Sequence, residues 1–426
     1  MAQAPPAEAG DKQKHWNAGP ERKHWKHLNA EIVATEVCVG CSACVVACPH
    51  HVIEMEGFRP RMQDPELGPD NCIHGEKSCS LCAMACLRLE PAVDSIEQML
   101  FGRRRKHPSE PWGIHREMWL ARAAAQDILP RGQDGGVVTA ILAWMLETGE
   151  IDGACVARPM KDKPWLDEPF LATNRDELIE AAGSRYTYAS NPLALKKAAE
   201  RKMKNVATVG VSCESTAIRE MQAEGIKRWS RMIKFVVGLM CNETFDYEPF
   251  IIDIIQGRYK INLDDITKIN IKGEVYVTLK NGEEIVIPLN ECKPYANTWC
   301  HHCPDFSAEH ADISFGGLGM SGWTMCVIRS EYGLDLWNRA VEAGAIETRP
   351  ADEEPGALKV LDRLAKKQRH RVGPFESHAA TRWPVREVLE RVRREYLEAG
   401  ADGDGPEKSN GKVGSESEGT KAAQGG

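Results

Sequence analysis

The 426-residue chain lacks the features that would tie it to a membrane, to secretion or to nucleic acid. It has no run of ~18 uncharged apolar residues, and its longest apolar stretch, residues 137–146, has only the length of a buried helix. Its first residues, MAQAPPAEAGDKQKHW, have no apolar core of the kind found in secretory signals. It has no basic excess either, because 54 Lys and Arg stand against 62 Asp and Glu for a net charge of -8, whereas nucleic-acid-binding domains are usually strongly basic. We therefore expect a cytoplasmic protein with no membrane span and no nucleic-acid partner, whose thiols stay reduced and available as metal ligands.

Cysteine, in contrast, is abundant: the chain has 15, and eight of them form two runs near the N-terminus. The first run, Cys38, Cys41, Cys44 and Cys48 followed by Pro49, has the C-x2-C-x2-C-x3-C-P spacing of bacterial ferredoxins. The second run has a wider first spacing and no proline after it; its members are Cys72, Cys79, Cys82 and Cys86. In such sequences each 4Fe-4S cluster takes three thiolates from one run and the last thiolate of the other. This crossed ligation predicts one cluster on Cys38, Cys41, Cys44 and Cys86, and another on Cys72, Cys79, Cys82 and Cys48.

Zinc is the alternative metal for these thiols. Zinc sites favour two C-x-x-C knuckles with four ligands, so eight cysteines in this order favour iron–sulfur instead. Two low-potential clusters close together pass single electrons and make or break no bonds. The remaining ~300 residues should therefore hold the group that converts one-electron transfer into a two-electron reaction, and flavin is the usual one.

Composition and periodicity divide the chain into six segments. We expect an N-terminal arm (1–30), a ferredoxin-like domain (31–98), a linker (99–130), a core (131–345), a helical extension (346–398) and a disordered tail (399–426). In the arm, Lys14-His15-Trp16 is echoed by Lys23-His24-Trp25, whose tryptophans either pack on the neighbouring domain or dock a partner. In the linker, the basic run from Arg103 to Lys106 is expected to be a solvated surface.

The core is predicted to have an α/β fold, because short apolar runs alternate with helical stretches after Pro130. The pattern predicts a helix over 137–147 and strands over 153–157, 206–211 and 233–240. From residue 266 to 289 the apolar period becomes two, with Asn281-Gly282 as a turn, which predicts an antiparallel hairpin insertion. Residues 334–397 are helical in pattern.

The segment Gln133-Asp134-Gly135-Gly136-Val137-Val138-Thr139 comes just before the strongest predicted helix. Glycines at a helix N-terminus let a phosphate approach backbone N–H groups at the positive end of the helix dipole. A glycine pair in this place is more often only a tight turn. The residues alone leave both interpretations open.

From this loop onward the sequence resembles a known family. The stretch QDGGVVTAILAWMLETGEIDGACV resembles the core signature of the family of coenzyme F420 hydrogenase/dehydrogenase beta subunits. The blocks that agree with it are AAGSRYTYASN, VGVSCESTAIREM, VVGLMCNETFDYE, ITKINIKGEVYVTL and WCHHCPDFSAEHADISFGGLGMSGWTMCVIRS. The similarity runs from about residue 28 to 345. The sequence departs from the family at Ser212 and Glu214, where members often have proline and glutamine around the first core cysteine.

The resemblance implies an FAD-containing oxidoreductase subunit that exchanges a hydride with coenzyme F420 and passes single electrons through 4Fe-4S clusters. By the same resemblance, a third cluster is held in the core by Cys213, Cys241, Cys300 and Cys303. From spacing alone only Cys300-His301-His302-Cys303 is suggestive, with a zinc knuckle or two structural thiols as alternatives. The resemblance places the FAD pyrophosphate at Gly135, Gly136 and Thr139, beside Gln133, and another part of the flavin at Ser184, Arg185 and Tyr186. No catalytic side chain is expected, because the flavin ring carries the chemistry.

The partner implied is a redox subunit of hydrogenase, formate dehydrogenase or heterodisulfide-reductase type, or a ferredoxin. Two other functions stay open: a ferredoxin-dependent FAD reductase of another substrate, similar to chlorophyllide reductases, and a non-catalytic electron-transfer adaptor. We expect Cys155, Cys292 and Cys326 to be buried structural residues, and His301 and His302 to be exposed loop residues. Border positions of the cofactor, or plain turns, are expected at Lys272, Gly273, Asp312, Gly316 and Gly317.

Overall fold

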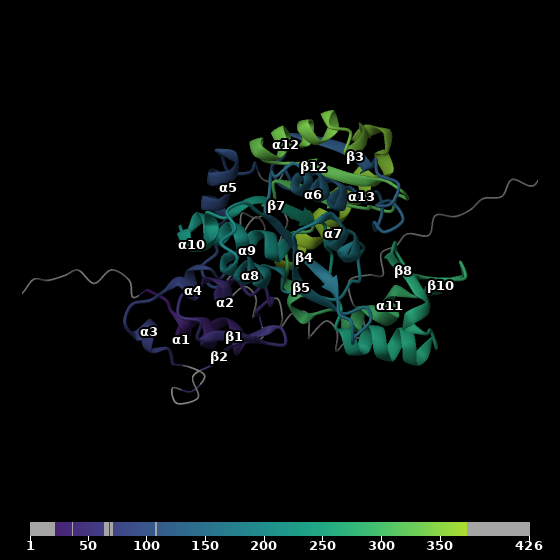
Figure 1. Ribbon diagram of the computed structural model, residues 1–426. Coiled ribbons are helices and arrows are strands. Elements are labelled where there is room, and N and C mark those ends of the chain that lie inside the picture. Colours follow the sequence, from purple (N-terminus) through teal and green to yellow (C-terminus); the bar gives the residue numbers. More distant parts are fainter. Residues whose placement is uncertain (1–21, 36, 64–67, 69–70, 107–108, 373–426) are drawn as a thin grey trace, which may run out of the picture.

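The computed structural model describes residues 22–35, 37–63, 68, 71–106 and 109–372. Figure 1 shows a central α/β core with two smaller lobes at its lower side. The N-terminal lobe, residues 22–89, lies at the lower left, and the hairpin lobe, residues 245–296, at the lower right. Among the described residues, no helix combines the length and the apolar character needed to cross a bilayer.

Short helices and one β-hairpin build the N-terminal lobe. They are α1 (Trp25–Leu28), the π-helical turn η1 (Asn29–Val33), α2 (Ala43–Ala47), β1 (Ile53–Glu56), β2 (Arg59–Met62), α3 (Ile73–Glu76) and α4 (Leu81–Met84). The next helix, α5 (Val93–Phe101), lies higher in Figure 1 and packs on the core helix α9 (Ser212–Ala223). Trp25 is buried with Leu28 and Ile32 among the cysteines of the lobe. The second Lys-His-Trp of the expected arm therefore packs into this lobe, whereas residues 1–21, with Trp16, lie outside the described residues.

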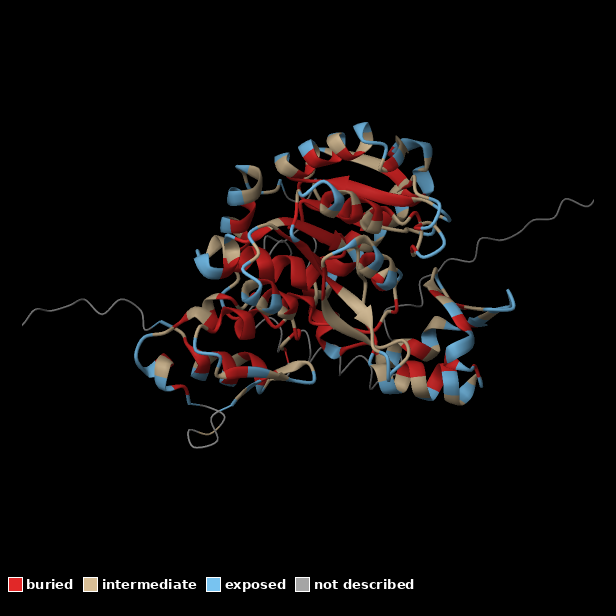
Figure 2. Cartoon of the chain, in the orientation of Figure 1, coloured by how far each residue is buried: buried red, intermediate tan, exposed pale blue. Residues whose placement is uncertain are grey.

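An eight-stranded mixed sheet forms the centre of the core, with the strand order β13-β3-β12-β11-β7-β6-β4-β5. Its strands are β3 (Glu117–Ala123), β4 (Gly153–Pro159), β5 (Asp167–Ala172), β6 (Val206–Val211), β7 (Ile233–Leu239), β11 (Ile313–Gly316), β12 (Thr324–Ile328) and β13 (Ile346–Pro350). The four middle strands β4, β6, β7 and β11 run parallel, and the strands outside them pair antiparallel. Figure 2 shows the buried residues running through this sheet.

Helices cover both faces of the sheet. One face carries α6 (Val137–Glu147), α7 (Arg175–Ala181) and α12 (Glu331–Glu342). The other carries η2 (Asn191–Leu193), α8 (Ala194–Glu200), α9 (Ser212–Ala223), α10 (Lys227–Ser230), the short turns η7 (Ala351–Glu353) and η8 (His370–Val372), and α13 (Pro355–Arg369). Helix α9 and the turn η2 also pack on α2, whose Ala43, Val46 and Ala47 belong to the same hydrophobic cluster as residues of the sheet, so the N-terminal lobe shares a core with the sheet.

The predicted elements of the core are largely confirmed. Helix α6 has the expected bounds and begins after Gly136, whose φ of +68° is one that residues with a side chain rarely adopt. Strand β6 matches its prediction residue for residue, and β4 and β7 differ from theirs only at the C-terminal end. Cys155, Cys292 and Cys326 are fully buried, as expected.

The hairpin insertion is confirmed as an antiparallel sheet with a core of its own. Its strands are β8 (Ile266–Ile271), β9 (Val275–Leu279) and β10 (Glu284–Ile287), and it also contains the π-helix η3 (Glu248–Arg258), η4 (Leu263–Asp265), α11 (Leu289–Cys292) and η5 (Lys293–Tyr295). Ile269, Val275 and Val277 pack against Phe250 and Ile254 of η3. The lobe is inserted between β7 and β11, which are neighbours in the central sheet.

The expected linker and helical extension both contribute strands to the sheet. In the linker, residues Glu117–Ala123 form β3, and Arg105 is buried in ion pairs with Glu97 and Glu309 instead of facing solvent. In the extension, residues Ile346–Pro350 form β13, which pairs with β3. Both strands are mixed in polarity, and their pairing partners far along the chain decide their conformation. Residues 355–369 are helical as predicted, and residues 373–426, with the tail, lie outside the described residues.

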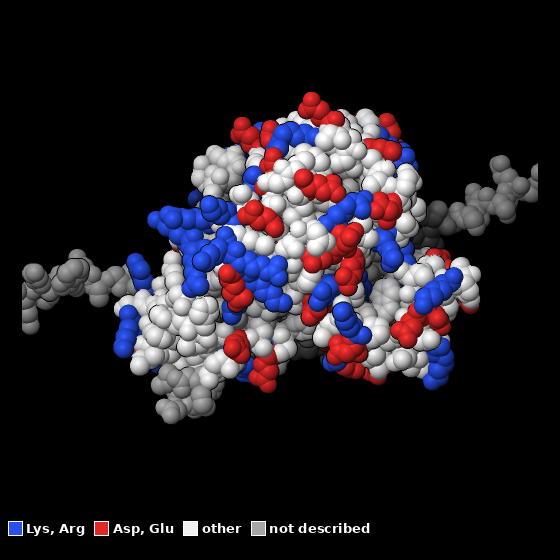
Figure 3. Space-filling view, in the orientation of Figure 1, with Lys and Arg blue, Asp and Glu red and all other residues white. Residues whose placement is uncertain are grey.

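The surface charge is uneven in spite of the net charge of -8. Figure 3 shows Lys and Arg gathered at the left, over α8 and α10 and beside the N-terminal lobe. The exposed cations of this region, here called the basic face, are Lys197, Arg201, Lys202, Lys204, Lys227, Arg228 and Arg231.

Candidate metal centres and cofactor site

The first predicted set of thiols shares one cavity. Cys38, Cys41, Cys44 and Cys86 all line it, although Cys86 follows α4 and the others lie in or before α2. Gly40 and Ser42 have left-handed backbone, with φ of +69° and +60°, and these two residues turn the loop so that its thiols converge. Burial raises the pKa of Cys86 to about 12 and the pKa of Cys41 and Cys44 well above the usual range. Thiols in such a dry site ionise readily only when a metal takes the proton's place.

The second set also lies together. Burial raises the pKa of Cys82, and the neighbouring thiolates of Cys48, Cys79 and Cys72 raise it further. Cys48 ends α2 and Cys82 lies in α4, and these two helices pack against each other. The eight cysteines are therefore grouped in space as crossed ligation requires.

The number and order of these thiols suit clusters of several iron atoms. Within the described ranges, no group of three His, Cys, Asp or Glu side chains is arranged to hold a single metal ion. In a 4Fe-4S cluster the ligands sit on different iron atoms, and two sets of four thiols supply the ligands of two such clusters. The donor set and its spacing thus fit 4Fe-4S clusters better than zinc.

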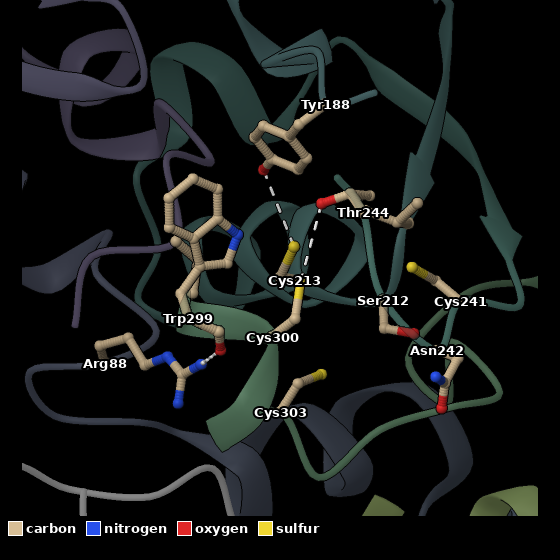
Figure 4. Close-up of a pocket in the computed structure, with 12 residues that line it drawn as sticks. Arg88, Tyr188, Ser212, Cys213, Cys241, Asn242, Thr244, Trp299, Cys300 and Cys303 are labelled. Atoms are coloured by element: carbon tan, nitrogen blue, oxygen red, sulfur yellow. Dashed lines mark hydrogen bonds between the residues drawn. The ribbon is translucent and has the colours of Figure 1, made fainter. Parts of the chain in front are cut away.

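The four core cysteines line a second cavity (Figure 4). Cys213 lies in the first turn of α9, directly after β6, and Cys241 follows β7. Because β6 and β7 are parallel neighbours, their C-terminal ends bring both thiols to one edge of the sheet. Cys300 and Cys303 reach the same place from η6 (Thr298–His302) and the residue after it. Burial raises the pKa of all four thiols, that of Cys303 to about 11.

Two hydroxyl groups contact the sulfur atoms of this core set. The Tyr188 hydroxyl lies 3.7 Å from Sγ of Cys213, and Oγ1 of Thr244 lies 3.7 Å from Sγ of Cys300. The Trp299 ring packs edge-on against Tyr188 at 6.0 Å between centroids and closes the cavity on that side. Hydrogen bonds to cluster sulfurs and exclusion of water are the main means by which a protein sets a cluster's potential. None of these three residues was predicted, and only their place inside the quoted family blocks pointed to them.

His302 is not an exposed loop residue, contrary to the expectation. It is 6% exposed, and its backbone oxygen accepts a hydrogen bond from Nη1 of Arg88 at 3.1 Å. Residues 298–302 form a 3-10 helix packed under the N-terminal lobe, which turns this histidine inward. His301 is half-buried.

Three of the predicted flavin residues meet through hydrogen bonds. Gln133 accepts from the Ser184 N–H at 3.1 Å, and its Nε2 lies 3.3 Å from the Tyr186 hydroxyl. The same Nε2 donates to the Ile269 carbonyl at 2.9 Å and to Oδ1 of Asn270 at 2.5 Å. Gln133 therefore joins the glycine loop, the segment at 184–186 and strand β8 of the hairpin lobe.

Packing accounts for the presence of glycine in the pair Gly135-Gly136. The Gly135 N–H donates to Oγ1 of Thr324 at 3.0 Å, and a Cβ on Gly135 would lie only 2.5 Å from the Ala121 carbonyl. A tight turn against β3 and β12 thus requires glycine here whether or not a phosphate binds. Thr139 lies half-buried in the first turn of α6, close to this turn.

Arg185 is engaged inside the protein. Its guanidinium is buried, pairs with Asp167 and donates to the carbonyls of Ala181 at 3.0 Å and Ala182 at 3.2 Å. Because its guanidinium is engaged by these internal partners, Arg185 is not directed at a ligand. This position differs from the flavin contact that the resemblance implies. Asp312 is likewise structural, because it accepts from Arg219, from the Ser330 hydroxyl and from the Val236 N–H.

Lys272 and Gly317 lie beside the glycine loop. Nζ of Lys272 is 4.0 Å from Oδ1 of Asp134 and donates to the Met320 carbonyl at 2.7 Å. The Asp134 carboxylate occupies the place that a Cβ on Gly317 would take. Burial raises the pKa of Asp134, and the charges of Lys272 and Lys268 oppose that rise. Loops 131–136 and 317–321 and the end of β8 thus meet at one place, with cations beside it.

Comparison with known proteins gives consistent matches over most of the chain. Residues 118–196 match the family model described as coenzyme F420 hydrogenase/dehydrogenase, beta subunit N-term, and residues 203–354 match the model of its C terminus. Residues 37–88 match a 4Fe-4S dicluster domain. The chain is 35% identical to the coenzyme F420 hydrogenase subunit beta of Methanothermobacter thermautotrophicus over 264 residues, which are 61% of this chain and 93% of the relative. It is 29% identical to the F420-dependent formate dehydrogenase subunit beta of Methanocaldococcus jannaschii over 253 residues, which are 58% of this chain and 64% of that protein.

A solved structure is also similar. A chain of the F420-reducing [NiFe] hydrogenase complex from Methanosarcina barkeri aligns with a TM-score of 0.59 at 30% sequence identity. The alignment covers 71% of the present chain and 98% of the other.

Proposed function

The chain belongs to the family of coenzyme F420 hydrogenase/dehydrogenase beta subunits, and from this premise we propose that it exchanges a hydride between FAD and coenzyme F420 and passes single electrons to or from a partner protein. The family is one of F420-linked iron–sulfur oxidoreductase subunits, and this chain also carries the matched dicluster domain. The hydride step, the flavin and the third cluster are the proposal.

The observation that carries the proposal is the continuity of the three cysteine sets. Burial raises the pKa of Cys213, and its neighbours Cys303, Cys41 and Cys241 raise it further, so the core set adjoins the first N-terminal set. Cys82 in turn raises the pKa of Cys44, which joins the first N-terminal set to the second. The cavities of the core set and of the first N-terminal set also share Val39 and Arg88 in their linings, so these two sets lie next to each other. Neighbouring sites of this kind are what single-electron transfer through a protein needs.

The residues of the chain have distinct roles in this proposal. Cys38, Cys41, Cys44 and Cys86 hold one cluster, Cys72, Cys79, Cys82 and Cys48 the second, and Cys213, Cys241, Cys300 and Cys303 the third. When bound, the clusters supply one-electron carriers, and FAD supplies the exchange between one- and two-electron chemistry. Tyr188 and Thr244 donate toward sulfur, and Trp299 keeps water out.

We place the flavin at the meeting point of the glycine loop and the hairpin lobe. Gln133, Ser184 and Tyr186 orient it, and Gly135, Gly136 and Thr139 border its pyrophosphate. Lys272 supplies a positive charge beside the loop, which suits the anionic groups of FAD or of coenzyme F420. Arg185 is left out of this site because its fork is used internally.

The partner is a hydrogenase, formate dehydrogenase or heterodisulfide-reductase-like subunit, or a ferredoxin. The basic face beside the N-terminal lobe supports a partner with an acidic docking surface.

Anaerobic purification followed by flavin titration tests the proposal. We expect ~12 iron atoms and one FAD per chain, because three cubanes hold four irons each. Reduced coenzyme F420 should bleach the flavin in the absence of any other electron donor. Bleaching only by ferredoxin would favour a reductase of another substrate, absence of flavin would favour an adaptor, and zinc in place of iron would refute the proposal.

A further inference from the structure

One arginine lies between two of the cysteine sets. Arg88 comes two residues after Cys86, and it lines both the core cavity and the cavity of the first N-terminal set. Among the described residues, no other Lys or Arg lines either cavity. Arg88 is only 1% exposed, so bulk water does not screen the charge of its guanidinium.

Hydrogen bonds fix the guanidinium on the loop of the core cysteines. Nη1 donates to the His302 carbonyl at 3.1 Å, and Nη2 lies 3.4 Å from the Trp299 carbonyl. These two carbonyls flank Cys300 and precede Cys303 in the chain. Figure 4 shows the guanidinium beside the Trp299 backbone, at the side of the space that the core thiols surround.

The charge of Arg88 is felt by both sets. All four core cysteines line one of the two cavities that Arg88 lines, and all four cysteines of the first N-terminal set line the other. A buried cation attracts negative charge that is placed nearby, so Arg88 stabilises negative charge at both sites.

We propose that Arg88 is a positioning residue for electron transfer, whose buried positive charge raises the reduction potentials of the core site and the adjoining N-terminal site together. The inference rests on the proposed function, because it concerns electrons held at those two sites. An electron that arrives at either site adds one negative charge, and a fixed cation nearby makes that state more favourable. One electron leaves one site as one enters the other, with no bond made or broken and no proton moved.

Arginine is suited to this role for two reasons. A guanidinium is always charged in proteins, and its planar arrangement of N–H groups can donate to two carbonyls at once. It therefore holds the N-terminal lobe against η6 while it supplies the charge. A shared cation also shifts both reduction potentials in the same direction. The difference in potential between the two sites therefore changes little, and the same electron donor can reduce both.

The test compares Arg88→Gln and Arg88→Lys with Arg61→Gln in the full-length, iron-loaded protein. Arg61 lies on β2 of the same lobe and is solvent-exposed, so its variant makes the same charge change where water screens it. Midpoint potentials are measured by anaerobic dye-mediated titration with EPR detection at both sites. In R88Q we expect the ratio of reduced to oxidised sites at a fixed potential to fall about tenfold, a shift of ~59 mV for a one-electron couple. R88K should retain most of the wild-type potential, and R61Q all of it.

Two results would overturn the role of Arg88. One is R88Q with ~12 iron atoms per chain and ratios within about twofold of wild type at both sites. The other is loss of iron from both R88Q and Arg88→Met, because Arg88 would then support the fold instead of setting potentials. A wild-type protein without iron would instead refute the proposed function itself, so the two failures are distinguishable.

Discussion

The side-chain amide of Gln133 offers a test of how the hairpin lobe is held against the core. Gln133→Leu keeps a side chain of similar size but removes the amide that donates to the Ile269 carbonyl and to Asn270, and that accepts from the Ser184 N–H. An amide NH2 has two hydrogens, so two donated bonds and one accepted bond are lost. Each is worth ~1 kcal/mol net, and water replaces part of the loss because Gln133 is only half-buried. We expect a cost of ~2–3 kcal/mol.

Two of the three lost bonds hold β8, so about 2 kcal/mol of this cost falls on the attachment of that strand and hydrogen exchange is the appropriate assay. Since ~1.4 kcal/mol is a factor of ten in an equilibrium, backbone amides in β8 should exchange roughly 30-fold faster in Q133L. The variant should also retain less FAD, because Gln133 joins three segments of the proposed flavin site. Gln98→Leu is the control, because Gln98 is exposed on α5 and the chemical change is the same. Equal exchange of β8 in Q133L and wild type would show that the apolar core of the lobe alone holds the strand, and the reasoning would be refuted.

Four further predictions concern the metal sites, the pH response and the surface. Cys303→Ser is expected to lower the iron content from ~12 to ~8 atoms per chain, whereas Cys292→Ser, which changes a buried thiol of the hairpin lobe, should leave it unchanged; an unaltered iron content in C303S would contradict the core cluster. Tyr188→Phe removes the hydroxyl 3.7 Å from Sγ of Cys213 and should lower the midpoint potential of the core site by ~20–60 mV, the equivalent of ~0.5–1.4 kcal/mol for one electron; EPR titration with no shift would remove Tyr188 from this role. Burial raises the pKa of Glu220 to about 8. The contribution of this group to the free energy of unfolding is therefore fully present below its unfolded pKa of ~4.3 and is lost as the pH rises to ~8. Glu220→Gln should lose less stability than wild type between about pH 5 and about pH 9, and the same pH dependence of urea denaturation in both proteins would contradict this. Reversal of charge on the basic face in R201E/K202E should slow electron transfer to an acidic partner several-fold and weaken its salt dependence, whereas K260E/K280E, at exposed lysines of the hairpin lobe, should not; equal rates would place the docking surface elsewhere.

The parts of the molecule that the sequence predicts well are those decided by neighbours along the chain. The spacing of Cys38, Cys41 and Cys44 is a local property, and left-handed backbone at Gly40 and Ser42 converts it directly into a thiol-lined loop. Helix α6 and the strands of the hairpin lobe follow from their own periodicity in the same way. The crossed grouping with Cys86 was predictable because the motif carries it.

The parts that were missed depend on contacts between distant residues. Strands β3 and β13 are mixed in polarity and do not stand out by their own pattern; β3 pairs with both β12 and β13, which come far later in the chain. Arg88 contacts carbonyls more than 200 residues away, and Tyr188 meets a thiol on another element. Arg185 has the composition of a phosphate ligand, but a buried Asp167 on β5 engages it. No spacing rule in one sequence contains these contacts.

The position of β3 sets the order in which this protein can form during its synthesis. The strand ends at Ala123, but both of its neighbours, β12 and β13, lie about 200 residues further on. At ~5–20 residues per second on the ribosome, β3 waits roughly 10–40 s for the strands that cover its edges. The cysteine-rich segment up to residue 101 has left the ribosome well before that time. Iron insertion into the first two sites can therefore precede closure of the sheet, and a chaperone that shields an open strand edge would act on residues 117–123.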